Sequence, residues 1–484
     1  MSGDDDPAHP AADAAAGGGV VRGAGPPERL LQQITHLEIQ GGLHWPYLQH
    51  NILERLPNLT HLVAGGSRYP ENAADDADAA ARAIGILSAC VLGHRLQSVF
   101  APNLVINHRT HASLSRLPCL SELVADCIDE QWQDPCLLEL TSLTRLWLAR
   151  SRGTWKLGAN LAQAELSLEE LTNMDLSPAT ADKLALAAPR LQRLAFCSAT
   201  SGRGAWGVPV THAFQNVTHL SIQVCEGFVS VHLKPRFPAL EHLAIVAALD
   251  VPSDDDADGD DGGARLDIAS LLSGLTGLRS LALERLEVGW ITPLARDAIA
   301  AMTRLEQLGV AVDVDDPASL AWLARVTTAV SLTLAPATAT MHDDDSQPAR
   351  VSLALEAAAH LPRLASLVLM VPLSTLPSAY PTSWELAPFL RFARGTTSLR
   401  TLEFRDMPLP PHALLCVLAA HLGLKAVEFS WGPATEGDMT RTAEVADLSA
   451  DSCSAGGPSM LWHVTERDPW KCRACSWKLP AFEW

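Results

Sequence analysis

A pattern of hydrophobic positions, apolar-x-x-apolar-x-apolar, recurs along the chain from about residue 30 to residue 430. Its clearest copy covers residues 143–148 and carries three leucines. Because successive side chains alternate across a strand, Leu146 and Leu148 would point to one face and Trp147 to the other. One such strand cannot bury its leucines alone, so each copy predicts one unit of a stack.

The copies follow one another at a mean step of roughly 28 residues. Strand-sized segments of this kind therefore alternate with stretches long enough for a helix. The first apolar positions are Ile34, Leu59, Leu96, Leu120, Leu143, Leu171, Leu191, Val217, Leu240, Leu278, Leu305, Ala329, Leu364, Leu399 and Leu424.

Helices are predicted between several of these strands. Pro293–Met302, Pro410–Leu422 and Leu386–Ala393 carry apolar residues at intervals of three and four, with proline at or near their starts. A strand, a helix and then a parallel strand give an α/β array with a curved sheet inside and helices outside.

The copies at residues 34–39, 278–283 and 399–404 resemble leucine-rich repeats. The mean step resembles the intracellular, ribonuclease-inhibitor-like subclass, in which each unit holds a strand and a full helix. The resemblance implies an α/β leucine-rich-repeat solenoid. The pattern normally places Asn or Cys eight residues after the first apolar position, and only Cys225, after Val217, complies. The repeats are therefore expected to be irregular.

Composition divides the chain into four parts. Residues 1–28 are rich in Asp, Ala, Gly and Pro and predict a disordered acidic lead, followed by the solenoid at 29–432 and a polar linker at 433–460. Residues 461–484 form a Trp-rich segment. The acidic start does not resemble a signal peptide, and no apolar run reaches the ~18 residues of a membrane span. A cytoplasmic or nuclear location is expected.

The Trp-rich segment has two interpretations. Trp462, Trp470, Trp477 and Trp484 could fold over the last repeat as a cap, or they could stay exposed as a docking tail. Cys472 and Cys475 form a single pair within this segment, and Cys453 and His463 stand at spacings that match no regular zinc finger. The cap is favoured, and no metal is predicted.

The net charge of the chain indicates which class of partner it can bind. The chain has 36 basic and 55 acidic residues, a formal net charge of −19 at pH 7. This charge repels nucleic acid and anionic membranes, so the expected partner is a protein, with a basic one favoured. The oligomeric state stays open.

Neither the candidate calcium-binding loop nor a search for enzyme motifs supports a metal-binding or catalytic function. Asp254, Asp256 and Asp258 fit the start of a calcium-binding loop, but Arg265 stands where the loop requires a bidentate Glu. Motifs for phosphate binding, zinc proteases, serine hydrolases and dinucleotides are absent from the sequence. We therefore expect neither an enzyme nor a cofactor.

Four histidines precede the second apolar anchor of their repeats, namely His36, His61, His219 and His242. Adjacent strands lie about 4.8 Å apart, close enough for the first two, or the last two, to share a metal ion. Solvated or partner-facing histidines are the favoured interpretation, because nothing nearby in the pattern supplies a full set of ligands.

The resulting hypothesis is a protein-interaction module that uses the concave face of the array. Trp147 is its foremost residue, because an exposed Trp is costly without a partner and Trp is frequent in binding hot spots. An alternative is a substrate-recognition subunit of a ubiquitin ligase, because the array resembles F-box leucine-rich-repeat proteins, although no F-box is evident. The candidate partner-binding residues are Glu38, Glu122, Arg145, Trp147, Asp175, Arg193, Gln307, Glu403, Arg405 and Glu428.

Overall fold

The structure is a computed structural model of the chain. The residues that it describes are 31–39, 55–64, 81, 84–85, 94–129, 140–148, 165–176, 178–198, 212–224, 232–247, 267–284, 291–312, 320–336, 354–370, 392, 395–396, 398–405, 426–431 and 461–466.

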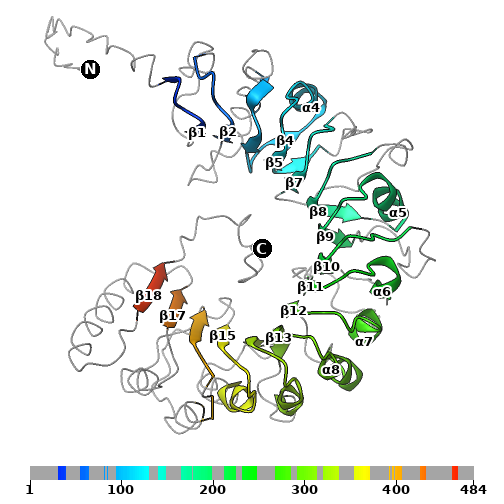
Figure 1. Cartoon of the computed structure of the whole chain (residues 1–484), viewed down its shortest axis with the longest axis vertical. Coiled ribbons are helices and arrows are strands. Elements are labelled where there is room, and N and C mark those ends of the chain that lie inside the picture. The colour runs from blue at the N-terminus through cyan, green and yellow to red at the C-terminus, as the bar shows by residue number, and fades with distance from the viewer. Residues whose placement is uncertain are drawn as a thin grey trace, which may run out of the picture.

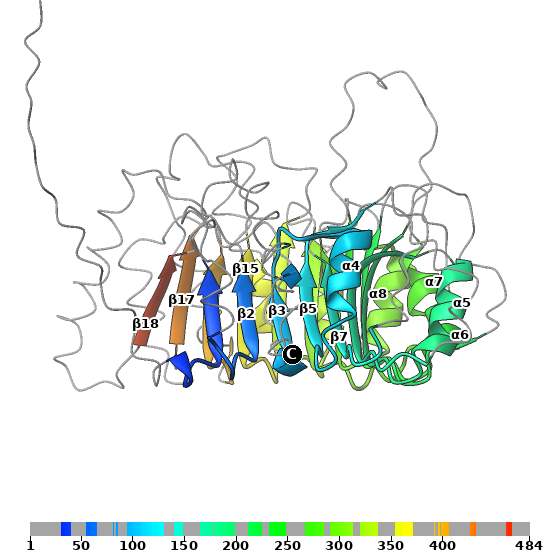
Figure 2. The same ribbon diagram turned by 90° about the horizontal axis from the view of Figure 1, so that it is seen from above.

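Sixteen strands form one continuous sheet in which the neighbouring strands pair in parallel. Figure 1 shows that the sheet curves, with the strands on the inner side of the arc. Viewed from above, in Figure 2, the strands stand side by side with a common direction. In sheet order the strands are β1 (His36–Ile39), β2 (His61–Ala64), β3 (Ser98–Phe100), β5 (Glu122–Ala125), β7 (Arg145–Leu148), β8 (Glu170–Leu176), β9 (Arg193–Ser198), β10 (His219–Val224), β11 (His242–Ala247), β12 (Ser280–Glu284), β13 (Gln307–Val312), β14 (Ser331–Pro336), β15 (Ser366–Met370), β16 (Thr401–Arg405), β17 (Ala426–Trp431) and β18 (Leu461–Glu466).

Helices lie on the outer side of this arc (Figure 1). The predicted helix at 293–302 is confirmed as α8, which begins after Thr292, whose hydroxyl accepts a hydrogen bond from the backbone N–H of Ala295. A second, two-stranded parallel sheet pairs β4 (Val105–Ile106) with β6 (Cys127–Ile128). Helices with described bounds include α4 (His108–Leu114), α5 (Pro178–Ala187), α6 (Leu233–Arg236), α7 (Ile268–Leu272), α8 (Pro293–Ala300) and the 3₁₀ helix η6 (Trp322–Arg325).

Many repeats begin one anchor earlier than the sequence pattern indicates. In the second repeat, the backbone N–H of Leu59 donates to the carbonyl of Leu56 at 3.1 Å, and Leu56, Leu59 and Leu62 are all buried. The same three-residue turn joins Leu117 to Leu120 and Leu275 to Leu278. This turn accounts for the additional spacing of three before the strand in these repeats.

Consecutive repeats are joined by a shared backbone acceptor. The carbonyl of Thr35 accepts the N–H groups of both Thr60 and His61, at 2.9 and 3.0 Å. The same arrangement recurs along the array as far as Ala365, whose carbonyl accepts from Arg400 and Thr401. These bonds satisfy the backbone at the point where the chain enters each strand and fix the register between neighbours.

Asparagine side chains add cross-repeat bonds at two of these turns. The Nδ2 atom of Asn58 donates to the carbonyl of Gln32 at 2.6 Å, and that of Asn216 donates to Pro189 at 2.8 Å. Both residues begin an Asn-x-Thr sequence, and Nδ2 is the atom to which a glycan would attach. The two amides hold neighbouring repeats together in the folded array.

The hydrophobic core runs without a break from Leu31 to Leu402 and is built largely from leucine, with other aliphatic residues. Each repeat adds its leucines to the layer of the next, as in Leu243, Leu281 and Leu308 on three neighbouring strands. The chain is therefore an α/β leucine-rich-repeat solenoid, as the pattern predicted. The longest described helix, α5, has 10 residues, and no described helix is long and apolar enough to cross a bilayer.

One repeat was assigned to the wrong register. The leucine pattern predicts Leu171 as a first anchor, but the sheet pairs Leu171 with Leu146, which is a second anchor. A register shift follows between Leu171 and Met174 in β8. Because of this irregularity, the leucine pattern fits the sequence with either Leu168 or Leu171 as the first anchor. In the structure the repeat begins at Leu168, which is buried.

The sheet continues after the last predicted repeat. The backbone of β18 pairs in parallel with β17, so Trp462 takes the register position of Val427 and Val464 that of Phe429. The linker at 433–460 and the rest of the Trp-rich segment lie outside the described residues. So do residues 250–263 and the helices predicted at 410–422 and, except for Phe392, at 386–393.

Candidate protein-binding surface

The concave face of the sheet carries an unbroken row of polar residues. These are the first residues of the strands from β1 to β16, and each is in register with the next. Second residues that are buried, or half-buried in the case of Leu37, alternate with them, so the row faces away from the core, although Ser280 is itself buried. In sheet order it consists of His36, His61, Ser98, Glu122, Arg145, Glu170, Arg193, His219, His242, Ser280, Gln307, Ser331, Ser366 and Thr401.

Four consecutive members of this row alternate in sign, and we call them the charge ladder: Glu122, Arg145, Glu170 and Arg193. The Nη1 atom of Arg145 lies 2.7 Å from Oε1 of Glu122, and its Nε lies 3.9 Å from Oε2 of Glu170. The same Oε2 lies 3.8 Å from Nη1 of Arg193. The pair of Arg145 and Glu122 is exposed and contributes little to stability, whereas the side chain of Glu170 is only 16% exposed. The ladder therefore matters chiefly as a charge pattern on the concave face.

Histidine pairs flank the ladder on the same row. The rings of His36 and His61 stack with centroids 4.1 Å apart, and those of His219 and His242 stack at the same distance. The hydroxyl of Thr60 lies within hydrogen-bond distance of the carbonyl of Thr35, at 3.1 Å, and of Nδ1 of His61, at 2.8 Å. Thr60 therefore holds the His61 ring at the entry to its strand.

The pairs do not form a metal site of the kind that the sequence suggested. The ring planes are within 9° and 5° of parallel, so the in-plane lone pairs of each pair run side by side and do not converge on one ion. Within the described part of the chain, no group of three or more His, Cys, Asp and Glu side chains could hold a metal.

Burial makes the second histidine pair sensitive to pH. The pKa of His219 is lowered to about 4, first by burial and then by the nearby His242 and Arg193. Burial also lowers the pKa of His242, although Glu241 raises it in part. Both rings therefore favour the neutral form at pH 7, which suits their stacking.

We expect this pair to make folding depend on pH. The unfolded chain takes up a proton near the ordinary pKa of 6.5, whereas folded His219 does so near pH 4, so stability falls as the pH falls between these values. Because the rings are half-buried, the loss should be about 1 kcal/mol after allowance for solvent screening. Thermal midpoints measured from pH 7 to pH 4 should fall less in His219→Gln than in the native chain, and equal slopes would contradict the assignment.

An apolar strip lies beside the row on the N-terminal half of the sheet. It consists of the third residues of β2, β3, β5 and β7, which are in register: Val63, Phe100, Val124 and Trp147. The first three are half-buried, and Trp147 is 40% exposed. A run of large apolar side chains on a solvent-facing sheet is typical of a binding surface.

The structure places the sequence-derived candidates at different points of this face. Glu122, Arg145 and Trp147 lie together on β5 and β7, with Arg193 two strands farther along. Glu38 is exposed on β1, Gln307 is exposed on β13, and Glu403 is on β16. Asp175, Arg405 and Glu428 lie in the strands β8, β16 and β17, and their side chains are outside the description.

Glu170 is the member of the ladder that the sequence did not predict. The misassigned register at Leu171 placed Asp175 on the outward face and left Glu170 outside the repeat. The signal was present, because Leu168 and Leu171 have the spacing of three that separates the first two anchors in the other predicted repeats. Glu170 joins the two arginines, since it lies within 4 Å of both.

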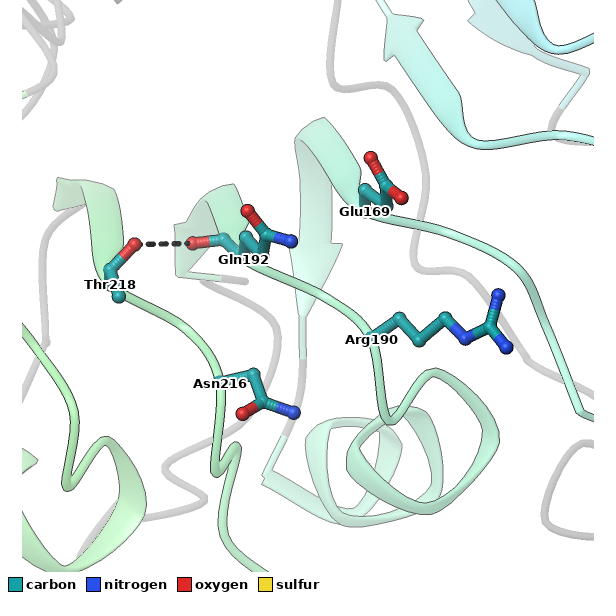
Figure 3. Close-up of a pocket in the computed structure, with 5 residues that line it drawn as sticks. All are labelled: Glu169, Arg190, Gln192, Asn216 and Thr218. Carbon is teal, nitrogen blue, oxygen red and sulfur yellow. Dashed lines mark hydrogen bonds between the residues drawn. The ribbon is translucent and has the colours of Figure 1, made fainter.

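A small open pocket lies at the rim of the sheet beside the ladder (Figure 3). Its volume is about 290 Å³, and its polar lining includes the residues that immediately precede β8, β9 and β10. The hydroxyl of Thr218 donates across it to the carbonyl of Gln192 at 3.5 Å. Its lining includes one acidic and one basic residue, Glu169 and Arg190, which could pair with a polar group bound in the pocket. The lining residues are Glu169, Arg190, Gln192, Asn216 and Thr218.

Comparison with known proteins gives distant structural similarities. No family model and no curated protein matches the chain. The crystal structure of a TLR13–ssRNA13 complex is similar over 79% of this chain, with 13% identity and a TM-score of 0.35, and the chain spans about half (55%) of that protein. A leucine-rich-repeat protein of Leptospira interrogans is similar over 81% of this chain and 95% of its own, with 12% identity and a TM-score of 0.30. Neither similarity bears on what this chain binds.

Proposed function

We propose that the protein is a recognition module that binds another protein through the concave face at β2–β10. The observation that carries the proposal is the exposed Trp147 at the end of the apolar strip and beside the charge ladder. A Trp contributes large apolar area at a binding site, and charges at its edge set the orientation of the partner. Strands and helices in units of about 28 residues also support the intracellular, ribonuclease-inhibitor-like subclass.

The outer surface provides a matched control for Trp147. Leu186 on α5 is 44% exposed, close to the 40% of Trp147, but it lies on the helical side of the array. If any exposed apolar side chain promoted association, replacing either residue would weaken it. If the concave face binds a partner, only Trp147 matters.

Affinity capture followed by quantitative mass spectrometry should separate these cases. We expect Trp147→Ala to weaken capture of a specific partner by about thirtyfold, equivalent to about 2 kcal/mol, because a central Trp is a typical hot spot. Leu186→Ala should capture that partner as the native chain does. Equal capture by all three proteins would refute the proposal.

The same experiment addresses the ubiquitin-ligase hypothesis. A substrate-recognition subunit would bind its substrate through the concave face and its ligase adaptor elsewhere. Adaptor subunits would therefore be captured equally by the native chain and by Trp147→Ala, while a second protein is lost. Capture without any adaptor supports a recognition module outside a ligase.

A further inference from the structure

The apolar strip has a definite length and direction. Val63, Phe100, Val124 and Trp147 stand on four neighbouring strands, so the strip runs across the strands and not along them. Three steps of about 4.8 Å give it a length of about 14 Å. It is bounded in the same register by Glu38 on β1 and by Thr172 on β8.

This spacing fits the turns of an α-helix better than an extended strand. A helix presents one apolar residue per turn of about 5.4 Å, which differs from the strip by about 0.6 Å per step. A strand repeats its side chains on one face every ~6.7 Å, a difference of about 2 Å per step and about 6 Å over the strip. Addition of a strand would also need a sheet edge, and these residues lie on the face.

The charges beside the strip specify the polar side of such a helix. Glu122 and Arg145 stand on the same strands as Val124 and Trp147, and Glu170 follows one strand later. Because the sign alternates at every step, a complementary helix carries a base, an acid and a base on successive turns. The net charge of the chain favours a basic partner, but a uniformly basic helix would face Arg145 and Arg193.

We propose that the strip binds an amphipathic α-helix of a partner protein, about ten residues long, with one apolar residue per turn and a neighbouring row of charges that alternates in sign. The charges lie beside only the β5–β7 end of the strip, so they orient the helix, because a reversed helix would leave its own charges without partners. This inference rests on the proposed function of the concave face and specifies the chemistry of its partner.

Selection from a displayed library of 20-residue helical peptides on the full chain tests the proposal. We expect enriched peptides to combine an apolar residue at every turn with alternating charges, and their affinity to fall at least tenfold against Trp147→Ala. Leu186→Ala should bind them unchanged. Selection on Arg145→Glu should replace the acid opposite that position by a base.

Other outcomes would contradict the proposal that the strip binds a helix. Failure to enrich any peptide, enrichment of peptides with interior prolines or uniform charge, or equal affinity for Trp147→Ala would each contradict it. If a captured protein still depends on Trp147 in those cases, the concave face binds a partner of another shape, and the proposed function stands. Concentration-dependent dimerisation that Trp147→Ala abolishes would instead identify a second copy of the chain as the occupant.

Discussion

Replacing Asp182 by alanine should lower the free energy of unfolding by roughly 3 kcal/mol. Arg236 is only 1% exposed, and its Nη2 atom lies 3.5 Å from Oδ1 of Asp182. Burial lowers the pKa of Arg236, and the carboxylate of Asp182 raises it in compensation. Without that carboxylate, a buried cation between the outer helices α5 and α6 would lose its countercharge. Chemical denaturation of the variant and the native chain measures the loss.

An exposed ion pair on the same outer layer is the control. Arg325 and Asp297 are only 2.7 Å apart, but both side chains are more than half exposed. Asp297→Ala should therefore cost less than about 1 kcal/mol, although its pair is the shorter one. Arg236→Met combined with Asp182→Ala should recover most of the stability, because no buried charge remains. A loss from Asp297→Ala as large as that from Asp182→Ala would show that distance, not burial, decides.

The sheet could be predicted from the sequence because its determinants are local. Each copy of the leucine pattern carries its own alternation, and parallel stacking follows from the need to bury the leucines of neighbouring units. The helix at 293–302 could also be predicted from local signals, since Pro293 marks its start and Ile299 fits the apolar periodicity of a helix.

Features that depend on two elements at once could not be predicted. The bulge in β8 permits two registers for Leu171, and only pairing with Leu146 selects between them. Arg236 appears in the sequence as an ordinary surface cation, and its burial follows from the packing of the outer helices. The β18 strand lacks a preceding leucine anchor, so its pairing with β17 had no signal in the pattern.

The candidate surface was predictable in part. Alternation within one strand placed Arg145 and Trp147 on the same face, and the structure sets Glu122 beside them. The charge ladder could not be predicted, because it includes Glu170, and the wrong register at Leu171 left Glu170 outside the predicted repeat. The net charge of −19 belongs to the whole chain, so it does not indicate the local charge pattern of the ladder, in which four side chains alternate in sign.

The most direct test of the concave face is a charge exchange that preserves both fold and net charge. Glu122→Arg combined with Arg145→Glu keeps an ion pair between β5 and β7 but reverses the pattern that a partner meets. Asp297→Arg combined with Arg325→Asp makes the same exchange on the outer surface. The outer exchange should melt within a few degrees of the native chain, since that pair is exposed. The exchange on the ladder also places an acid beside Glu170, so it should melt lower than the outer exchange while remaining folded.

The measurement is the affinity of the partner whose capture depends on Trp147. Like charges brought together at an interface cost several kcal/mol, so the exchange at Glu122 and Arg145 should weaken binding more than tenfold. The exchange at Asp297 and Arg325 should leave the affinity unchanged. Unaltered affinity after the exchange on the ladder, in a folded protein, would contradict recognition through the concave face.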